Sequence, residues 1–373
     1  MSAGPETNPR ENRMLAHTVF PFFSTRSHGT GSEWPNILTG EYSRAPVNNM
    51  VSKEDPKSKA FKKVAVKDIK VSKGMTVDDM LTQMGKAGGF TAQKLADATD
   101  IVEKMVKKEG VLKILSFPAC IMATGTRGVI VDMVKNHMVD VIITTCGCLD
   151  HDLSRLYAAY YKGDFMMDDA LLRQHDVSRL GNVLVPDDCY GVVLEDNLLP
   201  MFDEIFAETQ SLSTHEIIDK VGEKIANVKG HEDSLLYWAH VNKVPIVVPG
   251  ITDGSFGCQL WMYYQTHRKL RIDLFGDEQM LSEMTNEAKY TGAVIIGGGI
   301  SKHHVIWWNQ FRGGLDYCIY LTTAMEYDGS LSGAQIREAV SWGKVKSNAK
   351  KMTVEGDATI TLPLIYAGVV NRL

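Results

Sequence analysis

No stretch of the 373-residue sequence approaches the roughly 18 consecutive apolar residues that cross a bilayer, so a membrane-spanning protein is not expected. The six cysteines form no CxxC pair and are too sparse for a disulfide scaffold, which favours a reducing compartment. The net charge of -5 gives no reason to expect binding to nucleic acid or to a membrane surface. Residues 1–50 lack a secretory pattern and have equal numbers of acidic and basic side chains. These absences predict a cytoplasmic protein.

An N-terminal arm and one large domain are expected. Residues 1–50 are rich in Ser, Thr, Asn, Gly and Pro without sustained periodicity, and residues 52–63 form a basic segment broken by proline. We interpret residues 1–60 as an arm and linker that is poorly ordered or regulatory. Nothing divides residues 61–373, which are predicted to be a single catalytic domain.

Helix signals come first in that domain, and strand signals follow. Thr76 and Asp79 predict a capping box that opens a short helix, and Thr91 is expected to cap a second one. Continuous Val- and Ile-rich runs then alternate with helical stretches. This pattern predicts an α/β fold with a Rossmann-like, mostly parallel sheet and helices on both faces. The apolar runs cover residues 111–117, 139–145, 243–249, 293–296, 317–322, 352–354 and 360–365, and helices are expected at 124–137 and 234–241.

Neither a P-loop nor a G-x-G-x-x-G motif occurs in the sequence, but Gly297-Gly298-Gly299 follows an apolar run and precedes a predicted helix. Glycines at such a turn let the backbone approach a pyrophosphate, which the first amides of the helix can bind. A tight turn without a ligand is the alternative.

Small or acidic residues follow other predicted strands, where a parallel sheet binds dinucleotides. They are Thr145, Cys146, Gly147, Asp253, Thr323, Ala324, Asp357 and Ala358. The carboxylates of Asp253 and Asp357 could accept hydrogen bonds from a ribose. The alternative is that Asp-Gly and similar pairs only mark turns.

The segment Glu338-Ala-Val-Ser-Trp342-Gly-Lys344 could hold a nucleophilic amine. A lysine reacts as an amine only when it is neutral, and desolvation beside an indole would lower its pKa. Glu338 could pair with a cationic substrate, and Trp342 could face its ammonium group. A surface lysine after a helix-ending glycine is the other interpretation.

Histidines occur next to two of these motifs. His303, followed by His304, lies close to the glycine turn and suits general acid–base work. No third ligand is spaced to make a metal site there, so none is expected. Asp150-His151-Asp152 could also be read as a metal motif, but a loop whose aspartate caps a helix is the stronger interpretation.

Taken in order, these segments resemble the deoxyhypusine synthase family, and more closely its archaeal-type branch. The similarity covers roughly residues 60–370. The segments that carry it are MVDVIITTCG, RLGNVLVP, PGITDGSFG, IIGGGISKHH, EYDGSLSGA and EAVSWGK.

The resemblance implies a reaction and a set of site residues. The family uses NAD to dehydrogenate spermidine and transfers its 4-aminobutyl group through an enzyme-lysine imine to a lysine of translation initiation factor 5A. By this match Lys344 would carry the group and His303 would assist proton transfer. Substrate contacts would come from Glu338 and Trp342, with Asp328, Gly329 and Asp150 expected to rebuild the polyamine anchoring that this sequence lacks. Dinucleotide contacts would come from Asp253, Gly298, Thr323, Ala324, Asp357 and Ala358, together with the 145–147 turn. The family forms homotetramers with active sites at dimer interfaces, and its N-terminal arm can cover an active-site entrance.

The sequence departs from animal-type members at several positions. Cys258 and Leu331 stand where those members have acidic residues that contact spermidine, so the polyamine donor is left open. Three rival functions also remain: a homospermidine synthase that uses a free diamine as acceptor, a regulatory subunit of a hetero-oligomer, and an unrelated NAD-dependent dehydrogenase.

Overall fold

The computed structural model describes residues 64–373, which form one compact unit. The arm and linker predicted for residues 1–60 lie outside the described residues. Within residues 64–373, no helix is long and apolar enough to span a membrane.

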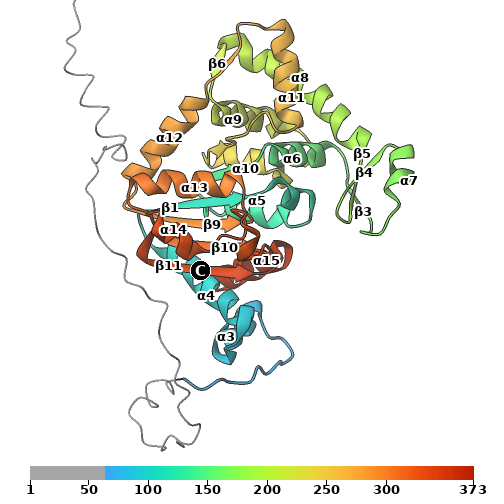
Figure 1. Cartoon of the computed structure of the whole chain (residues 1–373). Helices are drawn as coiled ribbons and strands as arrows, with labels where there is room; N and C mark the ends of the chain where they lie inside the picture. The colour runs from blue at the N-terminus through green and yellow to red at the C-terminus, as the bar shows by residue number, and fades with distance from the viewer. Residues whose placement is uncertain (1–63) are drawn as a thin grey trace, which may run out of the picture. The chain divides into compact units, whose positions relative to one another are not determined.

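Six parallel strands form the central sheet, in the order β11-β10-β9-β1-β2-β7 (Figure 1). From the centre, β1, β2 and β7 follow one another toward one edge, and β9, β10 and β11 follow one another toward the other edge. This is the order of doubly wound dinucleotide-binding sheets, and the order reverses between β1 and β9. The bounds are β1 (Val111–Phe117), β2 (Val141–Thr144), β7 (Ile246–Val247), β9 (Tyr290–Ile296), β10 (Leu315–Thr322) and β11 (Val345–Glu355).

Helices cover both faces of this sheet, which confirms the predicted fold class. Three of them pack on one face through a core that includes Leu281, Val305 and Ile336. They are α12 (Leu274–Glu287), α13 (Ile300–Phe311) and α14 (Ile336–Ser341). The larger core on the other side includes Leu115 and Ile142. Its helices are α3 (Val77–Ala87), α4 (Phe90–Lys107), α5 (Arg127–Lys135), α6 (Gly147–Tyr157), α8 (Gly191–Glu208), α9 (Thr214–Lys224), α10 (Leu235–Val241), α11 (Ser255–Thr266) and α15 (Ala358–Arg372).

A small antiparallel sheet with one helix is inserted between α6 and α8, and we call residues 161–186 the flap. Its order is β3-β5-β4, and Figure 1 shows it projecting beyond the end of the central sheet. The bounds are β3 (Tyr161–Lys162), α7 (Asp169–Gln174), β4 (Val177–Leu180) and β5 (Val183–Pro186). A further two-stranded sheet joins β6 (Ser211–Leu212) to β8 (Arg271–Ile272).

Three local expectations need correction. The capping box of Thr76 and Asp79 is present, but α4 begins at Phe90, so Thr91 lies inside the helix and not at its cap. The run 243–249 contains only a two-residue strand, β7. Residues 360–365 lie in helix α15, because the side chain of Asp357 accepts a hydrogen bond from the amide of Thr359 and caps that helix.

Candidate active site

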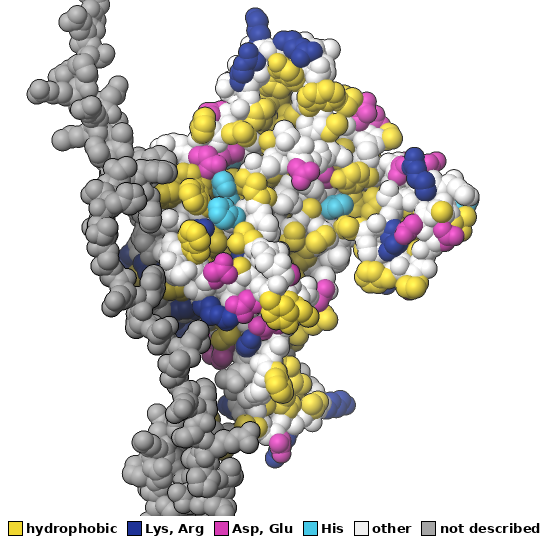
Figure 2. Space-filling view, viewed as in Figure 1, with side chains coloured by type: hydrophobic (Ala, Val, Ile, Leu, Met, Phe, Trp, Pro, Cys, Tyr) yellow, Lys and Arg dark blue, Asp and Glu magenta, His cyan; other side chains and the backbone are white. Residues whose placement is uncertain are grey.

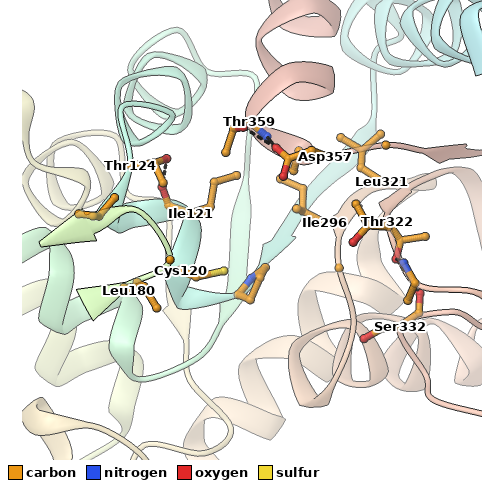
Figure 3. Close-up of a pocket in the computed structure, with 18 of the residues that line it drawn as sticks. Cys120, Ile121, Thr124, Leu180, Ile296, Leu321, Thr322, Ser332, Asp357 and Thr359 are labelled. Atoms are coloured by element: carbon orange, nitrogen blue, oxygen red, sulfur yellow. Dashed lines mark hydrogen bonds between the residues drawn. The ribbon is translucent and has the colours of Figure 1, made fainter. Parts of the chain in front are cut away.

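A cavity of about 630 Å³ lies at the carboxyl edge of the sheet, where the parallel strands end (Figure 3). Residues that follow β1, β9, β10 and β11 line it, so it spans the point where the strand order reverses. Four of the predicted cofactor residues are in its lining: Thr323, Ala324, Asp357 and Ala358. A cavity at this place in such a sheet suits a dinucleotide.

Asp357 presents one carboxylate oxygen at the cavity. Its Oδ1 accepts a hydrogen bond from the amide of Thr359 (2.7 Å) and contacts the Thr359 hydroxyl. Its Oδ2 has no hydrogen-bond partner among residues 64–373 and is free for a ligand. The N-terminal amides of α15 lie in the same wall, which favours negative charge there.

Backbone conformation and close packing require glycine in the turn of residues 297–299. Gly297 (φ 67°) and Gly299 (φ 78°) adopt left-handed conformations that favour glycine. A Cβ on Gly298 would lie 2.3 Å from the Cα of Ser332, so only glycine lets this turn lie against the loop of residues 325–335. Gly297 and Ser332 both line the cavity, whereas the predicted cofactor residue Gly298 does not.

The remaining predicted cofactor residues lie at the ends of β2 and β7 and do not line this cavity. The hydroxyl of Thr145 accepts a hydrogen bond from the amide of Ala119 (3.1 Å), which ties the end of β1 to the end of β2. Cys146 is buried, and burial together with the Asp150 carboxylate raises the pKa of its thiol to about 12. A Cβ on Gly254 would lie 2.7 Å from the Cys146 sulfur, so the loop with Asp253 packs against the 145–147 turn.

The structure gives Asp150 a different role from the predicted substrate contact. It is completely buried, and its carboxylate accepts hydrogen bonds from the amides of Ser255 (2.9 Å) and Phe256 (2.7 Å). The hydroxyl of Tyr190 donates a third bond of 2.7 Å. Asp150 therefore caps α11, as Asp152 caps α10 through the amides of residues 235 and 236. The predicted loop is wrong, because Asp150, His151 and Asp152 lie inside α6, and the two aspartates cap helices that come much later in the chain.

Lys344 owes its position to the way α14 ends. Gly343 (φ 68°) donates to the carbonyl of Val340 (3.0 Å), and the amide of Lys344 donates to the carbonyl of Ala339 (2.9 Å). This pair of bonds is a Schellman motif, which requires a residue such as glycine before the lysine. The carbonyl of Lys344 then accepts a bond from Leu315 and starts β11. The sequence Trp-Gly-Lys is thus the turn that directs the lysine inward.

The amine of Lys344 lies among aromatic side chains, on a residue that is itself mostly buried. Only 8% of the residue is exposed, and its Nζ lies 3.4 Å from Nε2 of His303. The Nζ is also 5.3 Å from the ring centre of Trp342 and 5.8 Å from that of Trp307. Burial lowers the pKa of Lys344, against a smaller opposing effect of Glu338. Burial and the nearby Lys344 charge also lower the pKa of His303.

The other predicted substrate residues lie on the segment that leads to Lys344. Glu338 and Trp342 are exposed on and just after α14, beside the lysine in sequence. Asp328 and Gly329 are exposed in the 325–335 loop, where Asp328 accepts a bond from the amide of Ser330 (2.6 Å). Figure 2 shows histidine side chains among hydrophobic ones on the face formed by α12 and α13. The structure thus brings Lys344 and His303 together and leaves the carboxylates of Glu338 and Asp328 accessible.

Sequence reasoning missed Lys302, which connects the two parts of the site. It is completely buried, and its Nζ donates to the carbonyls of Leu331 (2.7 Å) and Ala334 (2.9 Å). The Nζ also lies 4.0 Å from the ring centre of Tyr320. Lys302 therefore holds the loop that contributes Ser332 to the cavity and leads into α14. Its spacing of three and four residues from the apolar Val305 and Ile306 was a signal of its burial.

Replacing Lys302 with methionine is expected to separate stability from activity. An apolar side chain of similar length removes a buried charge, so the unfolding midpoint should stay equal or rise. The untethered loop should reduce turnover about ten- to a hundredfold, since small misplacements in a site are costly. Thermal unfolding and a turnover assay, with exposed Lys350→Met as the control, would check both. Unchanged turnover would contradict the tethering role.

The stability of Lys302→Met relative to the wild type should also depend on pH. Burial lowers the pKa of Lys302 from 10.5 to about 8, so the folded protein binds this proton less tightly than the unfolded chain. The buried charge of Lys302 therefore lowers the free energy of unfolding most below pH 8, and this loss disappears as the pH rises toward 10.5. The stability difference between Lys302→Met and the wild type should shrink over that window, as measured by urea unfolding at several pH values.

The fold and the site define the class of protein. A doubly wound sheet with a cavity at its strand-order reversal, together with a desolvated lysine beside a histidine, is the arrangement of an α/β enzyme able to use amine chemistry. The deoxyhypusine synthase family model matches residues 79–369, and the chain belongs to this family.

Archaeal relatives agree with this assignment. The chain is 49% identical over 305 residues to a probable deoxyhypusine synthase of Picrophilus torridus, a match that covers 82% of this chain and 96% of that protein. It is 48% identical over 302 residues to a probable deoxyhypusine synthase of Thermoplasma volcanium, covering 81% and 96%. The predicted similarity to the archaeal-type branch is thereby confirmed. The crystal structure of a candidate deoxyhypusine synthase from Entamoeba histolytica shares the fold, with a TM-score of 0.56 at 18% identity over 82% of this chain and 97% of that one.

Proposed function

We propose that this enzyme transfers the 4-aminobutyl group of spermidine, through an imine on Lys344, to a specific lysine of translation initiation factor 5A. The observation that carries the proposal is the buried amine of Lys344, whose pKa is lowered and which lies 3.4 Å from His303. A neutral amine can attack an imine carbon, whereas an ammonium cannot. Membership of the deoxyhypusine synthase family supports aminobutyl transfer for hypusine formation.

NAD is the proposed cofactor, and the cavity residues fit it. NAD would accept a hydride from spermidine and return it at the end of the reaction. Asp357 would hold a ribose through its free Oδ2, and the N-terminal amides of α15 with the 297–299 turn would face the pyrophosphate. Thr323, Ala324 and Ala358 would shape the same wall, while Asp253 and the 145–147 turn would approach the dinucleotide from the neighbouring strand ends.

The chain's own residues account for the transfer steps. The Lys344 amine forms a bond to the imine carbon of the oxidised polyamine, and 1,3-diaminopropane leaves with the proton that His303 supplies. The acceptor lysine then displaces Lys344 from the same carbon, which restores the free amine. Glu338 would pair with the distal ammonium group and Trp342 would lie along the chain, with Asp328 and Gly329 at the loop.

The family resemblance is also the basis for our proposals on assembly and location. We propose a cytoplasmic homotetramer with active sites at dimer interfaces, in which residues 1–60 form an arm and residues 61–373 the catalytic domain. The start of the family match at residue 79 supports this division.

One incubation tests the function. The protein is given NAD and labelled spermidine, with either the factor 5A precursor or putrescine as acceptor, and the mixture is trapped with borohydride. We expect label on the precursor and, without an acceptor, on Lys344. Label that reaches only putrescine would instead indicate a homospermidine synthase. No trapped enzyme, with free NADH accumulating, would indicate an ordinary dehydrogenase, and activity only with an added partner chain would indicate a regulatory subunit.

Asp357→Asn provides a matched test of the cofactor site. Asparagine caps a helix as well as aspartate does, so the unfolding midpoint should not change. Loss of the charged acceptor should weaken NAD binding about tenfold, because hydrogen bonds to charged groups contribute about 1.5–3 kcal/mol. Isothermal titration calorimetry measures the affinity. Unchanged affinity would remove Asp357 from the cofactor site.

A further inference from the structure

The flap is built as a self-supporting unit. Arg179 forms two hydrogen bonds of 2.7 Å with the carboxylate of Asp169 and donates a third, of 2.8 Å, to the carbonyl of Gly181. These bonds join α7, β4 and the turn that follows β4. Helix α7 has no buried residue, so its packing against the remainder of the molecule is slight. The flap therefore holds its shape through its own contacts.

The tip of the flap combines a tight turn with an aromatic ring. Gly181 (φ 62°) and Asn182 connect β4 to β5, and the glycine at the first turn position matches a two-residue hairpin loop. The carbonyl of Asn182 accepts a bond from the amide of Gly163 (2.9 Å). A Cβ on Gly181 would lie 3.2 Å from the ring of Phe165, so the turn rests on that ring.

This tip lines the cavity at the carboxyl edge of the sheet. Phe165, Leu180 and Asn182 are in its lining, and Leu180 lies near Cys120 and Ile121 of the segment after β1 (Figure 3). Phe165 is 66% exposed and Leu180 37% exposed, although both are apolar and border a concave site. An apolar surface open to a cavity on one side, with the free Asp357 carboxylate also in the lining, indicates a ligand with both a flat apolar part and a ribose.

The position of the reacting lysine shows which half of the dinucleotide belongs here. Hydride transfer requires the nicotinamide to lie beside the substrate amine, and that amine must reach Lys344 and His303. Neither residue lines this cavity. The cavity is therefore left for the half that does not react, the adenosine half.

We propose that Phe165, Leu180 and Asn182 form a wall that covers the adenine of the bound dinucleotide and retains the cofactor between the two halves of the reaction. This inference rests on the proposed use of NAD. The ring of Phe165 and the side chain of Leu180 provide an apolar surface for the base. The side-chain amide of Asn182 can donate a hydrogen bond to a ring nitrogen of adenine and accept one from its exocyclic amine. The reduced cofactor must stay in place until the acceptor arrives, and a wall on its far end slows its release without touching the reacting atoms.

Calorimetric titrations of the full-length protein test the wall. The ligands are NAD, ADP-ribose, which lacks the nicotinamide, and nicotinamide mononucleotide, which lacks the adenosine. We expect the double variant Phe165→Ala/Leu180→Ala to bind NAD and ADP-ribose about ten- to a hundredfold more weakly, in line with the loss of stacking on a base. Nicotinamide mononucleotide should bind as it does to the wild type. Asn182→Ala should weaken the same two ligands to a smaller extent.

The control is Leu171→Ala, a half-exposed apolar residue of the same flap that does not line the cavity. It should leave all three affinities unchanged. A second readout is NADH released during incubation with spermidine alone, which should increase in the double variant and not in the control.

The outcomes separate this inference from the proposed function. A wild-type protein that binds no NAD would refute the proposed cofactor itself. If the wild type binds NAD and the double variant binds it with the same affinity, the proposed adenine wall would be overturned but the proposed cofactor would stand. Unchanged affinity together with an altered mass in gel filtration would show that a second copy of the chain covers this apolar surface instead.

Discussion

Alanine in place of Lys344 is expected to reduce aminobutyl transfer about a thousandfold or more, because Lys344 is the lysine that contacts His303 among residues 64–373. Lys344→Arg should be equally inactive, since a guanidinium stays protonated and cannot form an imine. Borohydride should trap no labelled enzyme with either variant. NAD binding should be retained, because Lys344 does not line the cavity proposed for the cofactor.

Lys350→Ala is the matched control, an exposed lysine on the same strand, β11. It should transfer the group at the wild-type rate. Transfer at the wild-type rate by both Lys344 variants would remove this lysine from the reaction. The pH dependence gives a further check: burial lowers the pKa of Lys344, so the neutral fraction, and with it imine trapping, should rise with pH and level off at a lower pH than for an exposed lysine.

Asp150→Ala is expected to cost about 2–4 kcal/mol of unfolding free energy, the largest loss of stability among the changes considered. Removal of this carboxylate leaves the buried amide of Phe256, the partly buried amide of Ser255 and the Tyr190 hydroxyl without their partner. Each unsatisfied buried donor costs about 1–3 kcal/mol, and loss of a helix cap about 1 kcal/mol. Urea unfolding followed by circular dichroism would measure the change.

Asp150→Asn distinguishes the capping role from a substrate contact. An amide retains an acceptor oxygen for α11, so the stability loss should be smaller than with alanine, and KM for spermidine should not change. The exposed Asp196→Ala is the control for surface acidic residues. A raised KM for spermidine with wild-type stability would show that the carboxylate contacts the polyamine after all.

The sheet could be predicted from the sequence because its strands are buried on both faces. Strands β2, β9 and β10 are almost wholly buried, and such strands require the continuous Val and Ile runs that were recognised. The run 360–365 is equally apolar but helical, and short apolar runs do not distinguish the two states by periodicity. The flap escaped prediction because its strands are only two to four residues long.

The site was predictable where its geometry is local. Trp342-Gly343-Lys344 encodes its own turn, so a buried lysine beside an indole could be expected from neighbouring residues, whereas its approach to His303 could not. The capping of α11 by Asp150 could not be predicted, because that helix begins 105 residues later in the chain. No spacing rule connects positions so far apart. The burial of Lys302 likewise depends on how the 325–335 loop folds over α13.

The strand order has a consequence for how the protein is made. The central strand β1 pairs with β2 on one side, but on the other side Val111 pairs with Tyr290, which is synthesised much later. Until that part of the chain leaves the ribosome, one edge of β1 remains open, and open edges of apolar strands promote aggregation. Folding dominated by such distant pairings is slow. Chains that terminate before β9 are therefore expected to depend on chaperones or to be degraded.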